Sequence, residues 1–272
     1  MKKGLMIGLM GAMTLVACNQ EKEKVEDQFN YTVEQFADLQ LLRFKVHGFE
    51  ELPLKQKELV YYLSEAALQG RDILFDQNGK YNLIIRKMLE VVYTDYQGDR
   101  SDANFKNFET YLKRVWFSNG IHHHYAADKF VPGFTPEFFK SALESVDASK
   151  LPLMEGETLD ALCKEVFPVI FDAKVMAKRV NQADGEDLVL TSASNYYEGV
   201  TQKEAEDFYA KMKNPNDTMP VMFGMNSRLV KENGKIQEKV WKSGGLYGQA
   251  IDKIIYWLEK AQGVAENDKQ KA

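Results

Sequence analysis

The spacing of apolar residues changes once along this chain of 272 residues, and that change constrains the fold more than any other feature. From residue 32 through much of the chain, apolar residues recur every three or four positions, the period of an amphipathic helix. After about residue 184 strand-like segments appear, and Asn233-Gly234 separates two of them. Asn-Gly is a strong hairpin signal because both residues tolerate positive φ. The pattern predicts an α+β fold: a mainly helical region over 31–183, then a small mixed β-core with a hairpin and a long C-terminal helix over 184–272.

Capping signals predict where the individual helices begin and end. Thr32 with Gln35, and Thr201 with Glu204, each form a capping box ahead of apolar residues with helical spacing. Thr135-Pro136 predicts another helix start, because proline lacks only an N–H that the first turn leaves unbonded. The predicted long helices are Leu54–Gln77, Tyr81–Tyr96, Ser101–Ser118 and one that follows Gly244-Gly245 and contains Ile251 to Leu258. The predicted strands are Leu188–Tyr197, Pro220–Val230 and Lys235–Lys242.

The N-terminus has the features of an export signal. Lys2 and Lys3 precede an apolar run that is too short for a permanent membrane span. Leu15-Val16-Ala17-Cys18 resembles the lipobox of bacterial lipoproteins, in which the cysteine is acylated and becomes the mature N-terminus. We therefore predict a signal peptide over 1–17, lipidation at Cys18, a polar flexible spacer over 18–30 and a location in the bacterial cell envelope, on its periplasmic or surface side. A plain secretory signal with a coincidental cysteine is the alternative.

Composition excludes some partners. The formal net charge is −5, and it becomes more negative when the two lysines of the leader are removed. An acidic protein is poorly suited to binding phosphate backbones, so we expect no nucleic-acid partner. The second cysteine, Cys163, lies within a helical pattern, where a buried inert thiol is favoured over a nucleophile.

The histidine triplet His122-His123-His124 is the most visible chemical motif. Three consecutive residues do not all point at one ion, and His47 stands alone, so we predict no metal site formed by this chain by itself. A polar loop and a substrate-facing loop both remain open for the triplet. Gly244-Gly245-Leu246-Tyr247-Gly248 predicts a helix-entry turn rather than a phosphate loop, because the G-x-x-x-x-G-K-[ST] pattern is missing. The carboxylates are predicted to lie mostly on solvated helix faces.

Three segments together resemble a known family. Tyr61–Asp72, Trp116–Pro132 and Tyr256–Ala261 are similar to the N-terminal half of bacterial dipeptidyl peptidase III, and the resemblance runs from about residue 30 to the last residue. The family consists of two-lobed zinc peptidases that remove dipeptides from the N-termini of short peptides. Its H-E-x-x-G-H type zinc motif does not occur in this sequence. The resemblance therefore implies that this chain is the substrate-binding N-terminal portion, inactive alone, and that zinc, its water and the general base belong to a C-terminal lobe of the same protein.

The resemblance also implies a site. In the family a β-core binds the peptide as an added strand, and the matching positions here are Asn195, Tyr196, Tyr197, Gly199 and Asn226. Either Tyr125 or His122 is the expected contact for the reacting carbonyl. Two other classes remain open: a peptide- or solute-binding envelope lipoprotein without chemistry, and a structural envelope lipoprotein.

Overall fold

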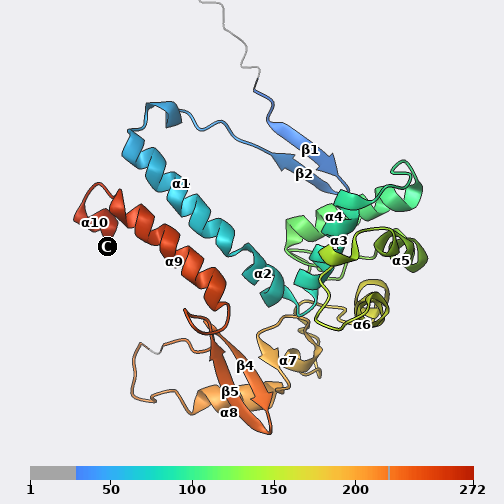
Figure 1. The fold of residues 1–272 in the computed structure, drawn as a ribbon. Coiled ribbons are helices and arrows are strands. Elements are labelled where there is room, and N and C mark those ends of the chain that lie inside the picture. Colours follow the sequence, from blue (N-terminus) through green and yellow to red (C-terminus); the bar gives the residue numbers. More distant parts are fainter. Residues whose placement is uncertain (1–28, 220) are drawn as a thin grey trace, which may run out of the picture.

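The computed structural model describes residues 29–219 and 221–272, so the predicted signal peptide, Cys18 and most of the spacer lie outside the described residues. The fold is α+β, with a helical N-terminal half, a small three-stranded sheet and a C-terminal helix that packs on the first helix (Figure 1). The helices are α1 (Leu54–Gln69), α2 (Arg71–Asn78), α3 (Asn82–Asp95), α4 (Ala103–Ser118), α5 (Pro136–Glu144), α6 (Leu159–Phe171), α7 (Leu188–Thr191), α8 (Gln202–Ala210), α9 (Gly248–Gly263) and α10 (Asp268–Lys271). The strands are β1 (Thr32–Phe36), β2 (Leu39–Leu42), β3 (Tyr197–Glu198), β4 (Ser227–Glu232) and β5 (Lys235–Val240).

Helices α3 to α6 surround the main hydrophobic core. Phe108 and Val115 lie on one face of α4 and are fully buried, as the helical spacing of apolar residues predicts. Thr135 and Thr158 begin α5 and α6, where each side chain accepts a hydrogen bond from a backbone N–H of the first turn. The predicted helices of this half are thus confirmed from α3 onward. Cys163 is a free, buried thiol on α6, as expected.

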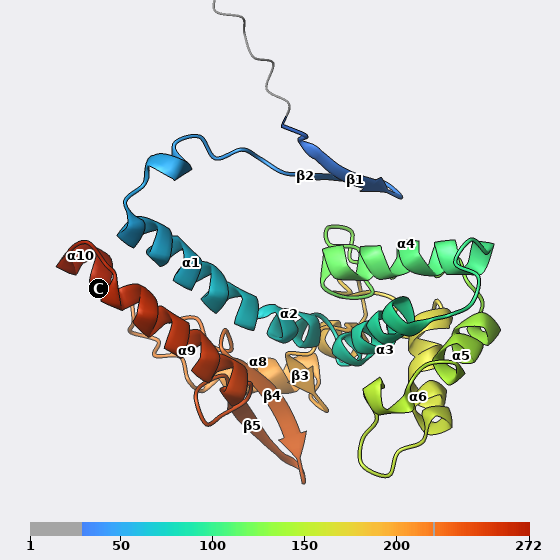
Figure 2. The same cartoon turned by 45° about the horizontal axis from the view of Figure 1, so that its top comes forward.

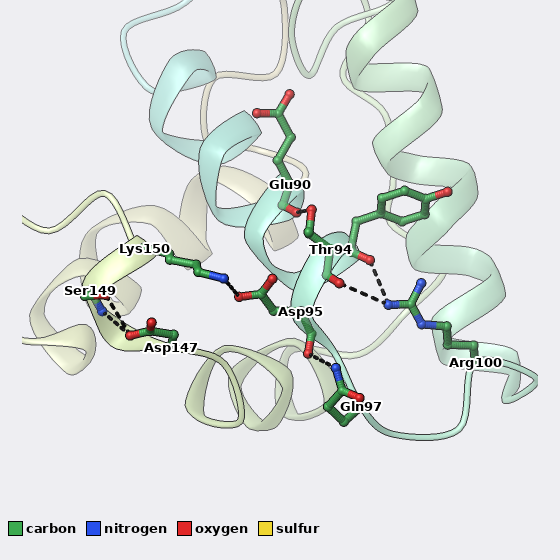
Figure 3. Close-up of polar contacts among 9 residues, drawn as sticks. Glu90, Thr94, Asp95, Gln97, Arg100, Asp147, Ser149 and Lys150 are labelled. Atoms are coloured by element: carbon green, nitrogen blue, oxygen red, sulfur yellow. Dashed lines mark hydrogen bonds and ion pairs between the residues drawn. The ribbon is translucent and has the colours of Figure 1, made fainter.

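Polar side chains fix the end of α3 (Figure 3). Arg100 donates through Nη2 to the carbonyl oxygens of Tyr93 at 2.9 Å and Tyr96 at 3.1 Å, which helps to satisfy carbonyls that the helix end leaves without a partner. Lys150 Nζ lies 2.6 Å from Asp95 Oδ2, which ties the chain after α5 to the same helix end. The loops that follow α3 and α5 are therefore both held against the C-terminal end of α3.

The predicted helix Leu54–Gln77 begins and ends as expected, but its prediction as a single helix is wrong, because the chain breaks into α1 and α2 at Gly70. Gly70 adopts φ −79° and ψ −9°, and its N–H bonds to the carbonyl of Ala67, three residues back. This tighter turn changes the helix direction, and Figure 2 shows α2 running at an angle to α1. Glycine inside a helix costs about 1 kcal/mol relative to alanine, so the break falls where the helix is weakest.

The helix predicted from the Thr32–Gln35 capping box is also wrong. The segment forms the antiparallel hairpin β1–β2, whose turn places Ala37 at φ 49°. Glu34 on β1 pairs with Lys113 on α4, and Asp38 in the turn pairs with Arg114 of the same helix at 2.9 Å. The hairpin is thus attached to α4, a contact between distant segments that the local capping signal does not show.

Helix α9 lies alongside α1, although the two are far apart in the sequence (Figures 1 and 2). The rings of Tyr62 on α1 and Trp257 on α9 stack with centroids 6.0 Å apart. Gln56 Nε2 donates to Glu266 Oε1 at 2.6 Å near the far end of the pair. The predicted C-terminal helix is confirmed, and it connects the mixed region back to the first helix.

The three-stranded sheet has the order β3-β4-β5. Strands β4 and β5 form the predicted antiparallel hairpin, with positive φ at both Asn233 (50°) and Gly234 (76°). Strand β3 runs parallel to β4, with Tyr197 opposite Leu229. Leu229 is fully buried and, together with Val200 and Ala205 of α8, forms a second, small core. The capping box that opens α8 is present as predicted.

The predicted strand Leu188–Tyr197 is mostly wrong, since residues 188–191 form α7 and β3 contains two residues. The physical reason is Asp187, whose carboxylate accepts hydrogen bonds from the backbone N–H groups of Val189 and Leu190 and so caps a helical turn. The predicted strand over 220–230 begins later, at Ser227. The division of the chain at residue 184 stays a prediction.

Candidate functional site

Asn195 connects the helical half to the sheet. It is 5% exposed, its backbone N–H donates to the carbonyl of Gln77 at the end of α2, and its carbonyl accepts from Arg228 Nε on β4; both distances are 2.9 Å. Because both backbone groups are bonded, the position of the residue is fixed. The backbone of Asn195 is therefore held between α2 and β4, two residues before β3.

Three side chains form a polar cluster that Arg228 connects to the Asn195 carbonyl, and we call it the Asp76 network: Asp76, Arg228 and Tyr247. The Asp76 carboxylate on α2 accepts hydrogen bonds from Arg228 Nη2 and from the Tyr247 hydroxyl, and Arg228 Nη2 lies 3.1 Å from that hydroxyl. Burial, and then the Asp76 carboxylate, raise the pKa of Tyr247, so the phenol stays protonated and donates. The network joins α2, β4 and the turn before α9.

Two buried donors at this end of the sheet lack a hydrogen-bond partner among the described residues. They are Asn195 Nδ2 and Trp241 Nε1. The ring of Tyr196 lies 5.8 Å from the Trp241 ring, and that ring lies 6.0 Å from the Tyr247 ring, so aromatic groups surround the region. Buried donors without acceptors are costly, so an acceptor oxygen brought to either atom would be stabilising. Both atoms are closed to solvent in this structure.

The free edge of β3 is the second element of the site. Leu229 N–H donates to the Tyr196 carbonyl at 2.9 Å, so by the alternation of a strand the N–H and carbonyl of Tyr197 point away from β4. No further strand pairs with this edge within residues 29–219 and 221–272. An unpaired edge is a template for an added strand.

Gly199 directly follows β3 in the chain, and Asn226 directly precedes β4. Gly199 has φ 67°, and a Cβ placed there would meet the Lys231 carbonyl oxygen at an ordinary 3.6 Å. Its left-handed backbone therefore explains the glycine better than crowding does. Asn226 is exposed, and its backbone carbonyl accepts a hydrogen bond from the backbone N–H of Trp241 at 2.8 Å. Since β3 and β4 are parallel, Asn195 and Asn226 lie at the same end of the sheet.

His122 and Tyr125 occupy very different environments. His122 is 2% exposed, and its Nε2 donates to the Met176 carbonyl at 2.7 Å, while burial lowers its pKa to about 4. Tyr125 is 87% exposed, and its ring lies 4.3 Å from that of His124. The imidazole of His122 is therefore neutral and inaccessible, and Tyr125 is the accessible one of the two candidates.

The segment Ala177–Arg179 joins the histidine loop to the Asn195 segment. On one side Lys129 N–H donates to the Ala177 carbonyl at 3.1 Å. On the other side Ser194 N–H donates to the Arg179 carbonyl, also at 3.1 Å. Backbone hydrogen bonds thus link the loop that carries Tyr125, through Ala177–Arg179, to the residue next to Asn195.

The described part of the chain offers no group of three His, Cys, Asp or Glu side chains placed to hold a metal ion. Burial raises the pKa of the Cys163 thiol, so this cysteine is not an activated nucleophile. None of the described helices is both long enough and apolar enough to cross a membrane.

Comparison with known proteins adds no relative: no family model matches the chain, and no curated protein matches it significantly.

Sequence reasoning missed the Asp76 network and the segment Ala177–Arg179. Asp76 falls among the carboxylates that were predicted, as a group, to lie mostly on solvated helix faces. Nothing in the local sequence signals its contact with Arg228, which is 152 positions away. The turn before α9 was predicted correctly, but the role of Tyr247 within it was not.

Proposed function

We propose that this chain is the N-terminal, substrate-binding part of a zinc-dependent dipeptidyl peptidase that removes dipeptides from short peptides, anchored in a bacterial envelope through Cys18. The zinc ligands belong to a C-terminal lobe of the same protein, so no residue of this chain is assigned to the metal. Support comes from the family resemblance of three segments spread along the chain, and from a site whose geometry suits an extended peptide.

The observation that carries the proposal is the unpaired edge of β3 next to buried donors that lack acceptors. A peptide that adds to this edge bonds through its backbone to the N–H and carbonyl of Tyr197. Its terminal or carbonyl oxygens then meet the side chain of Asn195, and the rings of Tyr196 and Trp241 exclude water. Binding through backbone groups selects chain length and termini more than side chains, which is what a dipeptidyl peptidase needs.

Tyr125 takes the role of contacting the reacting carbonyl in this proposal, because its phenol is exposed. His122 holds the loop instead, through its hydrogen bond to the Met176 carbonyl. Backbone hydrogen bonds through Ala177–Arg179 set the position of that loop relative to Asn195.

Peptide binding to the mature chain tests the proposal, with Tyr197→Pro and Tyr197→Ala as a matched pair of variants. Proline removes the outward N–H and the ring, whereas alanine removes the ring alone. Titration calorimetry with short peptides should give a Kd about tenfold higher for the proline variant than for the alanine variant, equivalent to about 1.4 kcal/mol. Equal Kd values would show that the edge of β3 does not bind peptide.

The catalytic part of the proposal has a separate test. The gene read beyond Ala272 should encode an H-E-x-x-G-H type motif, and the whole protein should release dipeptides from short peptides. A protein that binds peptides at β3 but has neither the motif nor the activity would instead be a non-catalytic peptide-binding lipoprotein.

A further inference from the structure

Tyr125 stands in a short loop, which we call the Tyr125 turn, residues 123–128. The backbone closes this turn: the His123 N–H donates to the Asp128 carbonyl at 2.7 Å, and the His123 carbonyl accepts from the Ala127 N–H at 3.0 Å. Ala127 has φ 60°, which places it in the left-handed region that residues other than glycine seldom adopt. A backbone shape of this kind persists only where the surrounding contacts hold it.

The His123 side chain supplies such a contact. Its Nδ1 accepts hydrogen bonds from two backbone N–H groups, that of Tyr125 at 3.2 Å and that of Ala126 at 3.1 Å. Because backbone amides donate and do not accept through nitrogen, Nδ1 is the unprotonated nitrogen of the ring. The imidazole therefore caps the turn, the task that Ser, Asp or Asn side chains perform at the start of a helix.

Neighbouring rings pack around the His123 imidazole. The imidazole is half-buried, the His124 ring stacks on it with centroids 4.4 Å apart, and the centroid of the buried Phe130 ring lies 6.1 Å away. This packing favours the orientation in which Nδ1 meets the two N–H groups. The phenol of Tyr125, by contrast, is 87% exposed, so its placement depends on the backbone of the turn.

The charged groups that border the turn, apart from the neighbouring imidazoles, are Asp38, Arg114, Asp128, Lys129, Lys178 and Arg179. Both carboxylates already have a basic partner: Asp38 pairs with Arg114 at 2.9 Å, and Asp128 pairs with Lys178. Among these groups, a protonated His123 would therefore gain no unpaired carboxylate in exchange for the two hydrogen bonds that it loses.

We propose that His123 is a positioning residue for Tyr125, and that the turn which presents the phenol is intact only while the His123 ring is neutral. Protonation would place an N–H on Nδ1 against two N–H donors, so both hydrogen bonds are lost and the turn opens. Histidine is the side chain that ordinarily changes charge between about pH 5 and about pH 8, so acidification within that range should release the turn. The inference rests on the proposed role of Tyr125 in contacting the reacting carbonyl and adds an acid limit to that role.

Amide hydrogen exchange tests the cap directly. The mature chain with Cys18→Ser carries isotope-labelled tyrosine and alanine, and NMR follows the exchange of the Tyr125 and Ala126 N–H groups at about pH 7.5 and about pH 5.5. Protection of each group is expressed relative to a free peptide at the same pH, which removes the intrinsic pH dependence of exchange. The Tyr62 N–H, inside α1, shows whether each protein is folded.

In the wild type, protection of the two N–H groups should fall about tenfold on acidification, equivalent to about 1.4 kcal/mol. His123→Asn should keep the protection at both pH values, because its side-chain oxygen accepts the same N–H groups but does not titrate. His123→Leu should lack it at both, and His124→Gln should lose it on acidification as the wild type does. Equal protection of the wild type at the two pH values would overturn the proposal, as would a loss that His124→Gln abolishes.

The whole protein separates this inference from the proposed function. Acidification should lower kcat for dipeptide release more steeply in the wild type than in His123→Asn, with similar KM, because the edge of β3 is untouched. Equal kcat profiles of the two proteins would overturn the positioning role even where protection depends on pH. Protection that depends on pH in a protein that releases no dipeptides would confirm the cap and reject the peptidase assignment alone.

Discussion

Asp76 on α2 and Arg228 on β4 form an ion pair across 152 positions of sequence, and Tyr247 donates to the same carboxylate. The side chains of Asp76 and Arg228 are 23% and 14% exposed. Arg228 also donates to the Asn195 carbonyl at 2.9 Å. One arginine therefore fixes both the junction of the two halves and the start of the candidate peptide-binding strand, so damage to the pair should affect stability and binding together.

Removing the charge of Asp76 should destabilise the chain. Asp76→Asn replaces charged hydrogen bonds by neutral ones, and we expect the free energy of unfolding to fall by about 2 kcal/mol. The control is Asp207→Asn, whose partner Lys203 is well exposed on the same helix; that change should cost at most about 0.5 kcal/mol. Urea unfolding measures both. Equal losses for the two variants would show that the Asp76 network contributes no more than a surface pair.

The buried His122 makes stability depend on pH. Burial lowers its pKa to about 4, despite the opposing hydrogen bond to the Met176 carbonyl; Lys129 and Arg179 lower it further and Asp128 raises it. In the unfolded chain the same imidazole has a pKa near 6.5, so only the unfolded state takes up the proton as the pH first falls. The contribution of the neutral His122 to the free energy of unfolding is therefore fully present above about pH 6.5. It is lost on acidification, and the loss between about pH 7 and about pH 4 amounts to about 3 kcal/mol.

His122→Gln is the matched variant for this measurement, because the amide can still donate to the Met176 carbonyl but does not titrate in this range. Urea unfolding of both proteins at the two pH values should show a smaller acid loss for the variant by that amount. Parallel pH profiles would mean that the pKa of His122 is the same in the folded and the unfolded chain.

Sequence patterns were sufficient to predict the elements whose signals lie within a few neighbouring residues. The turn at Asn233-Gly234, the capping box at Thr201 and the buried face of α4 each depend on residues within a few positions of one another. Their physical causes, positive φ, a side-chain cap and a helical apolar stripe, are visible in the sequence itself.

The errors fall where a distant contact or a single backbone position decides. Residues 32–42 have a spacing that suits either a helix or a strand, and the ion pair of Asp38 with Arg114 on α4 favours the hairpin. Gly70 divides a helix that the apolar pattern alone would continue. The candidate site is in the same situation: Asn195 and Tyr125 were selected by resemblance, but their connection through Ala177–Arg179 depends on pairing between segments that no local signal shows.

Cys18 lies outside the described residues, and its predicted acylation has a direct test. Cys18→Ala should release the protein from the membrane fraction or leave its signal peptide unprocessed, because the thiol is the site of lipid attachment. Two acyl chains anchor a protein stably where a single chain does not. Fractionation of cells with detection of the chain measures this, and unchanged membrane partitioning of the variant would reject the lipoprotein prediction.

The chain alone should hold no stoichiometric zinc and should not cleave dipeptidyl substrates. The described residues provide no cluster of three metal-binding side chains, and in the histidine triplet the His122 Nε2 is already bonded to a carbonyl. Metal analysis of the purified mature chain and a peptidase assay measure the two properties. Tight zinc at one ion per chain, lost when His122, His123 and His124 are replaced by alanine, would contradict the expectation.

Asn195→Leu separates a binding role of Asn195 from a purely structural one. Its backbone hydrogen bonds remain, and leucine has nearly the same shape, so removing a buried donor that lacks a partner should leave stability unchanged or slightly higher. If Nδ2 donates to peptide oxygens, the same change should raise the Kd for short peptides about tenfold, or about 1.4 kcal/mol. Calorimetry and urea unfolding of one preparation give both numbers. A variant that is more stable and binds peptide as well as the wild type would show that the donor serves no ligand, and that the peptide is held by the edge of β3 alone.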